Sequence, residues 1–141
     1  MFFGKKSGCA NLSMDKARLE LKNDPSIHLI DVRSPEEYRE GHIPGSRNVP
    51  VDRINEMEMA APDRDAKLFV YCLSGSRSAY ACAYLVRMGY TNVTNIGGIT
   101  QWSGEIETAA GRFVNFCWSD KSSIQMGINR CEQAVRACEA Y

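Results

Sequence analysis

The chain has 141 residues, of which 44% are hydrophobic and 24% are charged, and this balance predicts one globular domain. Lys and Arg together number 17, as do Asp and Glu, so no basic excess indicates binding to nucleic acid or to an anionic membrane surface. The opening residues, MFFGKKSG, do not form a secretory signal, and no stretch approaches the roughly 18 apolar residues of a membrane span, so we expect a cytoplasmic protein without membrane contact.

The first predicted elements are a short strand and a helix. The strand ends at Leu12, and Ser13 is a suitable N-cap for a helix from Met14 to about Lys22. The run Asn23-Asp24-Pro25 then favours a turn, because proline does not continue a helix.

A buried strand and two short helices follow. The apolar run from Ile27 to Val32 is typical of a buried strand. A helix over Arg33–Glu40 is predicted by Ser34-Pro35, a capping serine followed by proline at the first helical position. After a segment rich in glycine and proline, Val51–Met59 is expected to form a short helix that ends before Pro62.

The next strand, helix and strand complete an alternating pattern. Lys67–Tyr71 is a second buried strand, Arg77–Met88 a helix with Gly89 at its C-terminal end, and Thr91–Ile96 a further strand. Strands that alternate with helices predict a parallel α/β sheet. The face of this helix that packs against the sheet is predicted to carry Ala79, Cys82, Ala83 and Val86.

The sequence changes character near Gly111, so we expect a domain over residues 1–110 and an extension over 111–141. Alternating apolar residues at 114, 116 and 118 allow a short strand, and an amphipathic helix is predicted at about 122–139. This helix is expected to pack against the domain or a second copy of the chain. Its apolar stripe consists of Ile124, Ile128, Cys131, Val135 and Cys138.

Six cysteines occur in the chain, but their spacing predicts neither a disulfide framework nor a metal site. There is no C-x-x-C pair, and a chain of this length builds a core without disulfides. We therefore expect reduced thiols and no metal or other cofactor. The hypothesis that a tail thiol relays or resolves chemistry at Cys72 stays open for Cys117, Cys131 and Cys138.

The stretch "FVYCLSGSRSAYA" places Cys72 between a buried strand and a helix. The unpaired N–H groups and the dipole of a helix N-terminus favour the thiolate, which is the nucleophilic form. Residues 73–76 have the composition of a loop whose amides curl toward an anion, with Gly75 giving the required backbone freedom. Further donors come from Ser74, Ser76, Ser78 and Arg77. The alternative interpretation is a buried structural cysteine before an ordinary loop.

Three separate motifs resemble the rhodanese family of sulfurtransferases. "CLSGSRS" at 72–78 is similar to the family's active-site loop, and "LIDVRSPEEYREGHIPGSRNVP" resembles the signature after its second strand. "LVRMGYTNVTNIGGITQW" resembles the stretch that ends the family's domain. The resemblance covers about residues 9–108 and implies a three-layer α/β domain with a central, mainly parallel five-stranded sheet flanked by helices.

The resemblance also implies roles for particular residues. Cys72 would accept sulfane sulfur and carry it as a persulfide, and Leu73, Ser74, Gly75, Ser76, Arg77 and Ser78 would bind the substrate. Asp31 and Arg33 match the family's Asp-x-Arg and would mainly brace the loop, with Arg33 also drawing anions toward it. His42 would support the site by packing and hydrogen bonding.

The donor and acceptor are less well defined by the sequence. We expect a small anionic donor (thiosulfate, mercaptopyruvate or a persulfide) and a thiol, cyanide or protein acceptor. Thiosulfate-using relatives carry basic residues where this chain has Leu73 and Ser74, which disfavours the thiosulfate dianion. Two alternatives are a non-catalytic regulatory module and a phosphatase or arsenate reductase. The four residues between Cys72 and Arg77, one fewer than in phosphatases related by fold, favour sulfur over phosphate.

Overall fold

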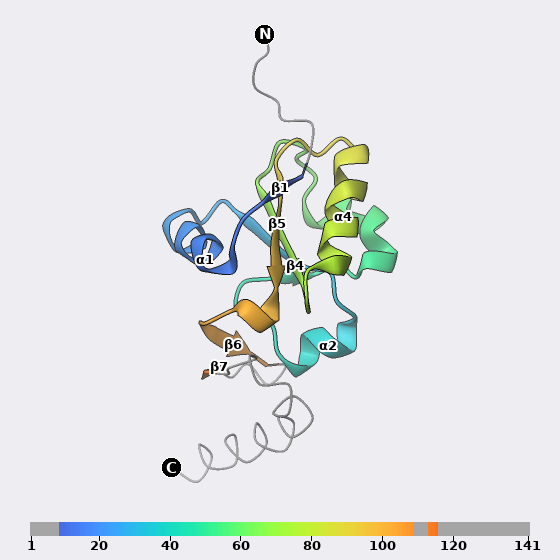
Figure 1. The fold of residues 1–141 in the computed structure, drawn as a ribbon. Coiled ribbons are helices and arrows are strands. Elements are labelled where there is room, and N and C mark those ends of the chain that lie inside the picture. The colour runs from blue at the N-terminus through green and yellow to red at the C-terminus, as the bar shows by residue number, and fades with distance from the viewer. Residues whose placement is uncertain (1–8, 109–112, 116–141) are drawn as a thin grey trace.

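The structure, a computed structural model, describes residues 9–108 and the backbone of residues 113–115 (Figure 1). The predicted tail helix at about 122–139, the tail thiols Cys117, Cys131 and Cys138, and the expected domain boundary near residue 110 lie outside the described residues.

A five-stranded sheet forms the centre of the fold, with strand order β1-β5-β4-β2-β3 and parallel pairing throughout. The predicted α/β class is therefore confirmed. Strands β3 and β6 were not expected, because Arg47–Asn48 is wholly polar and Glu105–Glu107 has a single apolar residue, so neither shows a strand pattern. In chain order the elements are β1 (Ala10–Asn11), α1 (Met14–Asn23), β2 (His28–Asp31), α2 (Pro35–Glu40), β3 (Arg47–Asn48), the 3₁₀ helix η1 (Val51–Glu56), α3 (Met57–Ala60), β4 (Leu68–Cys72), α4 (Ser76–Arg87), β5 (Val93–Gly98), the 3₁₀ helix η2 (Ile99–Gln101), β6 (Glu105–Glu107) and β7 (Phe113–Asn115).

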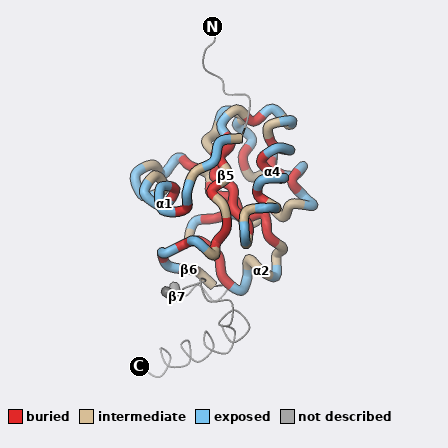
Figure 2. The backbone as a smooth tube through the Cα atoms, in the orientation of Figure 1, coloured by how far each residue is buried: buried red, intermediate tan, exposed pale blue. Residues whose placement is uncertain are grey.

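The two faces of the sheet bury separate apolar clusters, with α1 over one face and α4 over the other (Figures 1 and 2). Strand β4 is buried along its whole length, and its side chains alternate between the clusters. Leu68, Val70 and Cys72 join the cluster beneath α4, whereas Phe69 and Tyr71 join the cluster beneath α1. This alternation places the Cys72 thiol on the α4 side of the sheet.

Both predicted capping residues act as N-caps. Ser13 accepts a hydrogen bond from the Lys16 N–H and opens α1. Ser34 opens α2 with a complete capping box, in which its hydroxyl accepts from the Glu37 N–H and Glu37 accepts from the Ser34 N–H. The cap at α2 therefore also fixes where the Glu37 carboxylate lies.

The predicted buried face of α4 was wrong by about one residue. Ala79 and Ala83 are exposed and Val86 is half-buried, and of the predicted set only Cys82 is buried. Alanines at 79, 81 and 83 made the apolar pattern ambiguous, and the inward position of the Ser78 hydroxyl decides the rotation of the helix. The observed stripe is Ser78, Ala81, Cys82 and Leu85, at helical spacing i, i+3, i+4, i+7.

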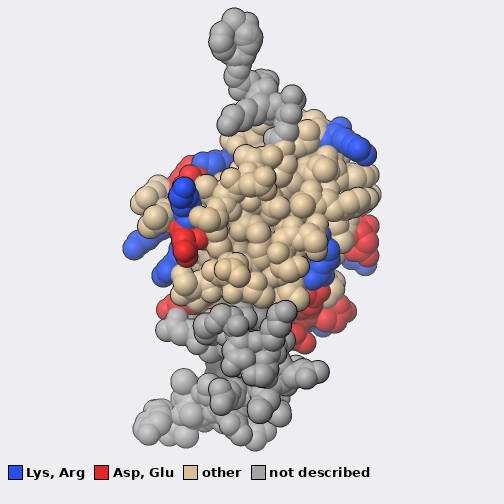
Figure 3. All heavy atoms as spheres, viewed as in Figure 1, with Lys and Arg blue, Asp and Glu red and all other residues tan. Residues whose placement is uncertain are grey.

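The charged side chains seen in Figure 3 lie around the edge of the described surface, with both signs close to one another. No basic patch dominates this face of the molecule. Among the described residues, no helix has the length and apolar character needed to cross a membrane.

A buried tyrosine ties the sheet to the segment that follows α2. The Tyr71 hydroxyl donates to Ser46 Oγ at 3.0 Å and accepts from the Ile43 N–H at 3.1 Å. Burial raises the pKa of Tyr71 well above its usual range, so the phenol stays protonated and continues to donate. The segment between α2 and β3 is thereby held against the end of β4.

Replacing Tyr71 with phenylalanine leaves the Ile43 N–H and the Ser46 hydroxyl without this partner. We expect Tyr71→Phe to lower the free energy of unfolding in urea by about 1–3 kcal/mol, the cost of stranding buried polar groups. Tyr80→Phe is the control, since Tyr80 is 64% exposed. Equal unfolding midpoints for Tyr71→Phe and the wild type would contradict this role.

Candidate active site

Cys72 is the last residue of β4 and is buried. Parallel strands end at the same edge of a sheet, so Cys72 lies at the edge where β2 ends with Asp31 and β5 ends with Gly98. The chain then makes a short loop and enters α4 at Ser76. The thiol is thus enclosed between the strand edge and the first turn of a helix.

Polar groups of the loop and of the first turn of α4 surround the Cys72 sulfur. The Gly75 N–H donates to Sγ at 2.9 Å, and Ser78 Oγ lies 3.5 Å from it. Burial by itself would raise the pKa of Cys72, but the Ser78 hydroxyl and the amides of Ser78, Gly75 and Ser74 outweigh it and lower the pKa below its usual value. The loop therefore favours the thiolate over the thiol.

The loop reaches the sulfur because its backbone adopts conformations that glycine permits. Gly75 has φ +110° and is the N-cap residue of α4. Its neighbour in space is β5, where a register shift opposite Val70 and Tyr71 brings Gly97 and Gly98 beneath the loop. A Cβ atom on Gly98 would lie 2.2 Å from the Leu73 carbonyl oxygen, so only glycine allows this approach.

Ser78 connects the sulfur to β5 through Asn95. Ser78 Oγ lies 2.8 Å from Asn95 Oδ1 and 2.9 Å from the Gly75 carbonyl oxygen. Asn95 Oδ1 also accepts from the Gly97 N–H at 2.9 Å. The sequence prediction missed Asn95, because the predicted strand also contains Thr91, Asn92 and Thr94, so one more polar residue gave no distinct signal.

Arg77 is paired with an acid that the sequence prediction also missed. Its guanidinium donates to both carboxylate oxygens of Glu37, at 2.7 and 3.0 Å. The hydrogen bond from Arg77 lowers the pKa of Glu37, and in return Glu37 raises the pKa of Arg77. The positive charge beside the loop is therefore matched by a carboxylate from α2.

Asp31 and Arg33 form a buried ion pair. Arg33 donates through Nε and Nη2 to the Asp31 carboxylate, the shortest contact being 2.6 Å, and also to the Gly41 carbonyl oxygen at 2.7 Å. Arg33 is 1% exposed, and its guanidinium lies over the Tyr71 ring. This geometry favours bracing over direct contact with an anion.

His42 packs against α2 rather than against the thiol loop. Its ring stacks on Tyr38 with centroids 3.7 Å apart, and Nδ1 is 2.8 Å from the Tyr38 carbonyl oxygen. Nε2 lies 3.4 Å from a Glu107 carboxylate oxygen. These contacts are those of a packing and hydrogen-bonding residue.

The other predicted loop residues differ in exposure. Leu73 is half-buried, and its carbonyl oxygen accepts from the Thr100 N–H at 3.5 Å. Ser74 and Ser76 are exposed, so their hydroxyls face solvent at the rim of the loop. Within the described part of the chain, no three His, Cys, Asp or Glu side chains gather as a metal site would require.

Cys9 and Cys82 form a second thiol pair close to the site. Cys9, Cys72 and Cys82 are all free thiols. A hydrogen bond from Cys82 lowers the pKa of Cys9 to about 7, and the same bond together with burial raises the pKa of Cys82. Reactivity measurements must therefore separate Cys9 from Cys72.

The arrangement places a thiol of lowered pKa among amides that point toward it, which is suited to nucleophilic attack and to holding negative charge. A thiolate at a strand end attacks an electrophilic sulfur, and amides aimed at the thiolate also stabilise the negative charge of a persulfide. Cys72 has no exposed surface, so the sulfur is enclosed by the loop and the chain around it.

A sequence model described as "Rhodanese-like domain" matches residues 14–105. The chain is 42% identical over 73 residues to the thiosulfate sulfurtransferase PspE of Escherichia coli K12, covering 51% of this chain and 70% of that protein. It is 38% identical over 84 residues to a sulfurtransferase of Allochromatium vinosum, covering 59% and 78%. Among solved structures, a rhodanese with anions from E. coli is similar, with TM-score 0.56 and 36% identity over 58% of this chain and 98% of that one.

Removing the Ser78 hydroxyl should make Cys72 a weaker acid. A hydrogen bond to a charged group stabilises it by about 1.5 kcal/mol or more, so we expect the thiolate fraction of Ser78→Ala at pH 7 to fall roughly tenfold. The measurement is the pH dependence of iodoacetamide alkylation at Cys72, resolved from Cys9 by peptide mass. The midpoint of the profile should move to higher pH.

Ser74→Ala is the matched control, because Ser74 contributes to the pKa of Cys72 through its backbone N–H. Its profile should coincide with that of the wild type. An unchanged midpoint in Ser78→Ala would show that the hydroxyl does not stabilise the thiolate.

Proposed function

The chain belongs to the rhodanese-like domain family, and we propose that it is a sulfurtransferase that carries sulfane sulfur as a persulfide on Cys72. The observation that supports this most directly is the thiol at the end of β4, whose pKa is lowered by hydrogen bonds from its own loop. The two relatives named above are themselves called sulfurtransferases.

The first half-reaction loads the cysteine. The Cys72 thiolate attacks the outer sulfur of the donor, an S–S bond forms, and the donor's own bond to that sulfur breaks. With thiosulfate the leaving group is sulfite, which departs with the bonding electron pair. The loop amides then hold the charged persulfide, with Ser74 and Gly75 supplying N–H groups that already point at Sγ.

The second half-reaction unloads it. An acceptor thiolate attacks the outer sulfur of the persulfide, a new S–S bond forms to the acceptor, and the Cys72 thiolate leaves. Cyanide would follow the same route and give thiocyanate. The lowered pKa of Cys72 assists this step, since a more acidic thiol is a better leaving group.

The charges around the loop bear on the choice of donor. Arg77, the cation at the start of α4, is already paired with Glu37, so its attraction for a dianion is reduced. We propose that the physiological donor is a monoanion or a low-molecular-weight persulfide rather than thiosulfate.

The persulfide itself is testable by intact mass. The full chain is incubated with thiosulfate, mercaptopyruvate or glutathione persulfide, and we expect an adduct of one sulfur atom, roughly 32 Da, on the wild type. Cys72→Ser should show none, whereas Cys82→Ser, which removes another buried thiol, should retain it. No adduct from any donor, together with phosphatase activity, would overturn the proposal.

Because Glu37 neutralises Arg77, we expect that removing the Glu37 charge improves the use of thiosulfate. Glu37→Gln keeps a side chain able to cap α2 but leaves the Arg77 charge unneutralised. We expect the KM for thiosulfate to fall about fivefold at low ionic strength, and the gain to shrink as salt screens the charge. Glu36→Gln, one residue away on the same helix, is the control. A KM for thiosulfate that is the same in Glu37→Gln and Glu36→Gln would contradict the donor argument.

A further inference from the structure

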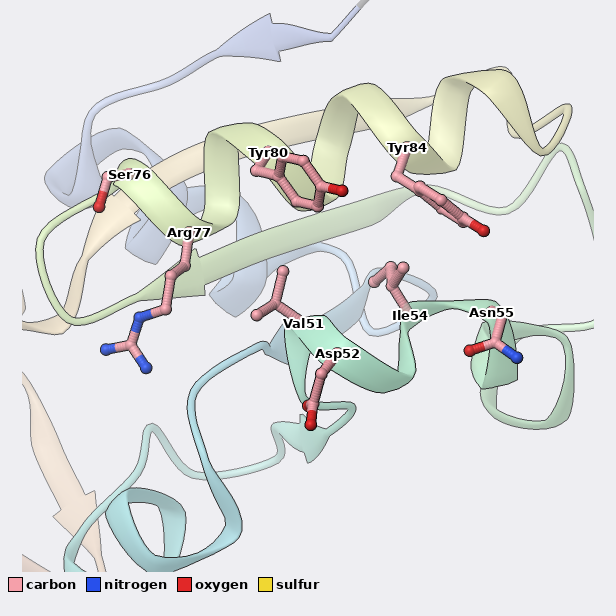
Figure 4. A pocket seen from close by; sticks show the side chains of 8 residues that line it. All are labelled: Val51, Asp52, Ile54, Asn55, Ser76, Arg77, Tyr80 and Tyr84. Atoms are coloured by element: carbon pink, nitrogen blue, oxygen red, sulfur yellow. The ribbon is translucent and has the colours of Figure 1, made fainter.

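A groove beside the loop has no role in the chemistry described so far. It lies between α4 and η1 and has a volume of about 470 Å³ (Figure 4). Ser76, Arg77, Tyr80 and Tyr84 line it from α4, and Asp52 and Asn55 line it from η1. We call this space the α4–η1 groove. Its volume falls within the range of small-molecule sites.

The groove begins at the active-site loop. Ser76 and Arg77 are the first two residues of α4, and the charge of Cys72 contributes to raising the pKa of Arg77. From Ser76 to Tyr84 the helix advances by about 12 Å, at 1.5 Å per residue. Three extended residues span about 10 Å, so a tripeptide would cover most of this length.

Two tyrosines line one side of the groove without belonging to the hydrophobic core. The buried stripe of α4 faces the sheet, whereas Tyr80 and Tyr84 lie one turn apart on the side of α4 that lines the groove (Figure 4). Tyr80 is 64% exposed and Tyr84 is 38% exposed. Such rings offer a flat apolar surface together with a hydroxyl, a combination that suits binding sites.

The groove is lined by one positive side chain, Arg77, and one negative side chain, Asp52. Arg77 lies at the loop end, and only two of its five N–H groups are used by Glu37. Asp52 projects from η1, and its carboxylate has no hydrogen-bond or ion-pair partner among the described residues (Figure 4). A ligand with a carboxylate near Arg77 and an ammonium group near Asp52 would satisfy both.

We propose that the α4–η1 groove binds a short zwitterionic peptide thiol, the acceptor that takes sulfur from Cys72. Its carboxylate pairs with Arg77, its ammonium group pairs with Asp52, and its backbone lies against Tyr80. This assignment rests on the proposed function, because it makes the peptide thiol the nucleophile of the unloading step.

The kinetic test compares two acceptors that share a thiol and a carboxylate. Glutathione carries an ammonium group, and 3-mercaptopropionate does not. We expect Asp52→Asn to raise the KM for glutathione about fivefold and the KM for 3-mercaptopropionate less than twofold. Tyr80→Ala should also raise the KM for glutathione. Equal changes for the two acceptors in Asp52→Asn would overturn the assignment.

Two controls come from α1, on the opposite face of the sheet. Asp15→Asn removes an acid from a first helical turn, as Asp52→Asn does, and Leu19→Ala removes an exposed apolar side chain. Neither should change the KM for glutathione.

A binding measurement separates this inference from the proposed function. S-methylglutathione has no thiol, so its Kd, measured by NMR titration of the full chain, does not depend on sulfur transfer. We expect it to bind Asp52→Asn and Tyr80→Ala at least fivefold more weakly than the wild type and the α1 controls. Equal affinity for all five proteins would overturn the groove assignment, even if Cys72 forms a persulfide. Weakened binding without any persulfide would support the groove and reject only the chemistry.

Discussion

Burying a thiol at the end of a strand favours its neutral form, and the site depends on how the adjoining loop reverses that preference. The Cys72 sulfur has no exposed surface, yet its pKa is lowered because amides and a hydroxyl point at it from one short stretch of chain. These donors are available because the first N–H groups of a helix have no partners within the helix. Gly75 turns the backbone so that one of them reaches the sulfur at 2.9 Å.

The position of the loop depends in turn on β5, a strand that contributes no nucleophile. Its register shift against β4 brings Gly97 and Gly98 under the loop, and the Leu73 carbonyl occupies the space that a side chain at Gly98 would fill. Asn95 then joins the same strand to Ser78. On the other side, α2 holds Arg77 through Glu37. The loop is thus located by contacts with two elements distant from it in sequence.

Local patterns in the sequence predicted much of this arrangement. The strand, loop and helix around Cys72 are encoded within one stretch of chain, and the caps at Ser13 and Ser34 follow from neighbouring residues. Contacts between residues that are distant in the sequence could not be predicted in the same way. Arg77 and Glu37 are 40 residues apart, and no local pattern indicates that the first turn of α2 lies beside the start of α4. The buried face of α4 was predicted wrongly because the alanines leave several faces of the helix equally apolar. Which face is buried is set by the contact between Ser78 and Asn95, which the sequence does not show.

The Ser78 hydroxyl has a single proton and several acceptors within reach: Asn95 Oδ1, the Gly75 carbonyl oxygen and the Cys72 sulfur. A thiolate competes strongly for that proton, whereas a persulfide carries its charge on the outer sulfur and competes less. Loading sulfur onto Cys72 would therefore release the hydroxyl toward Asn95. The hydrogen bond between Ser78 and Asn95 would then be stronger in the sulfur-loaded protein than in the free one.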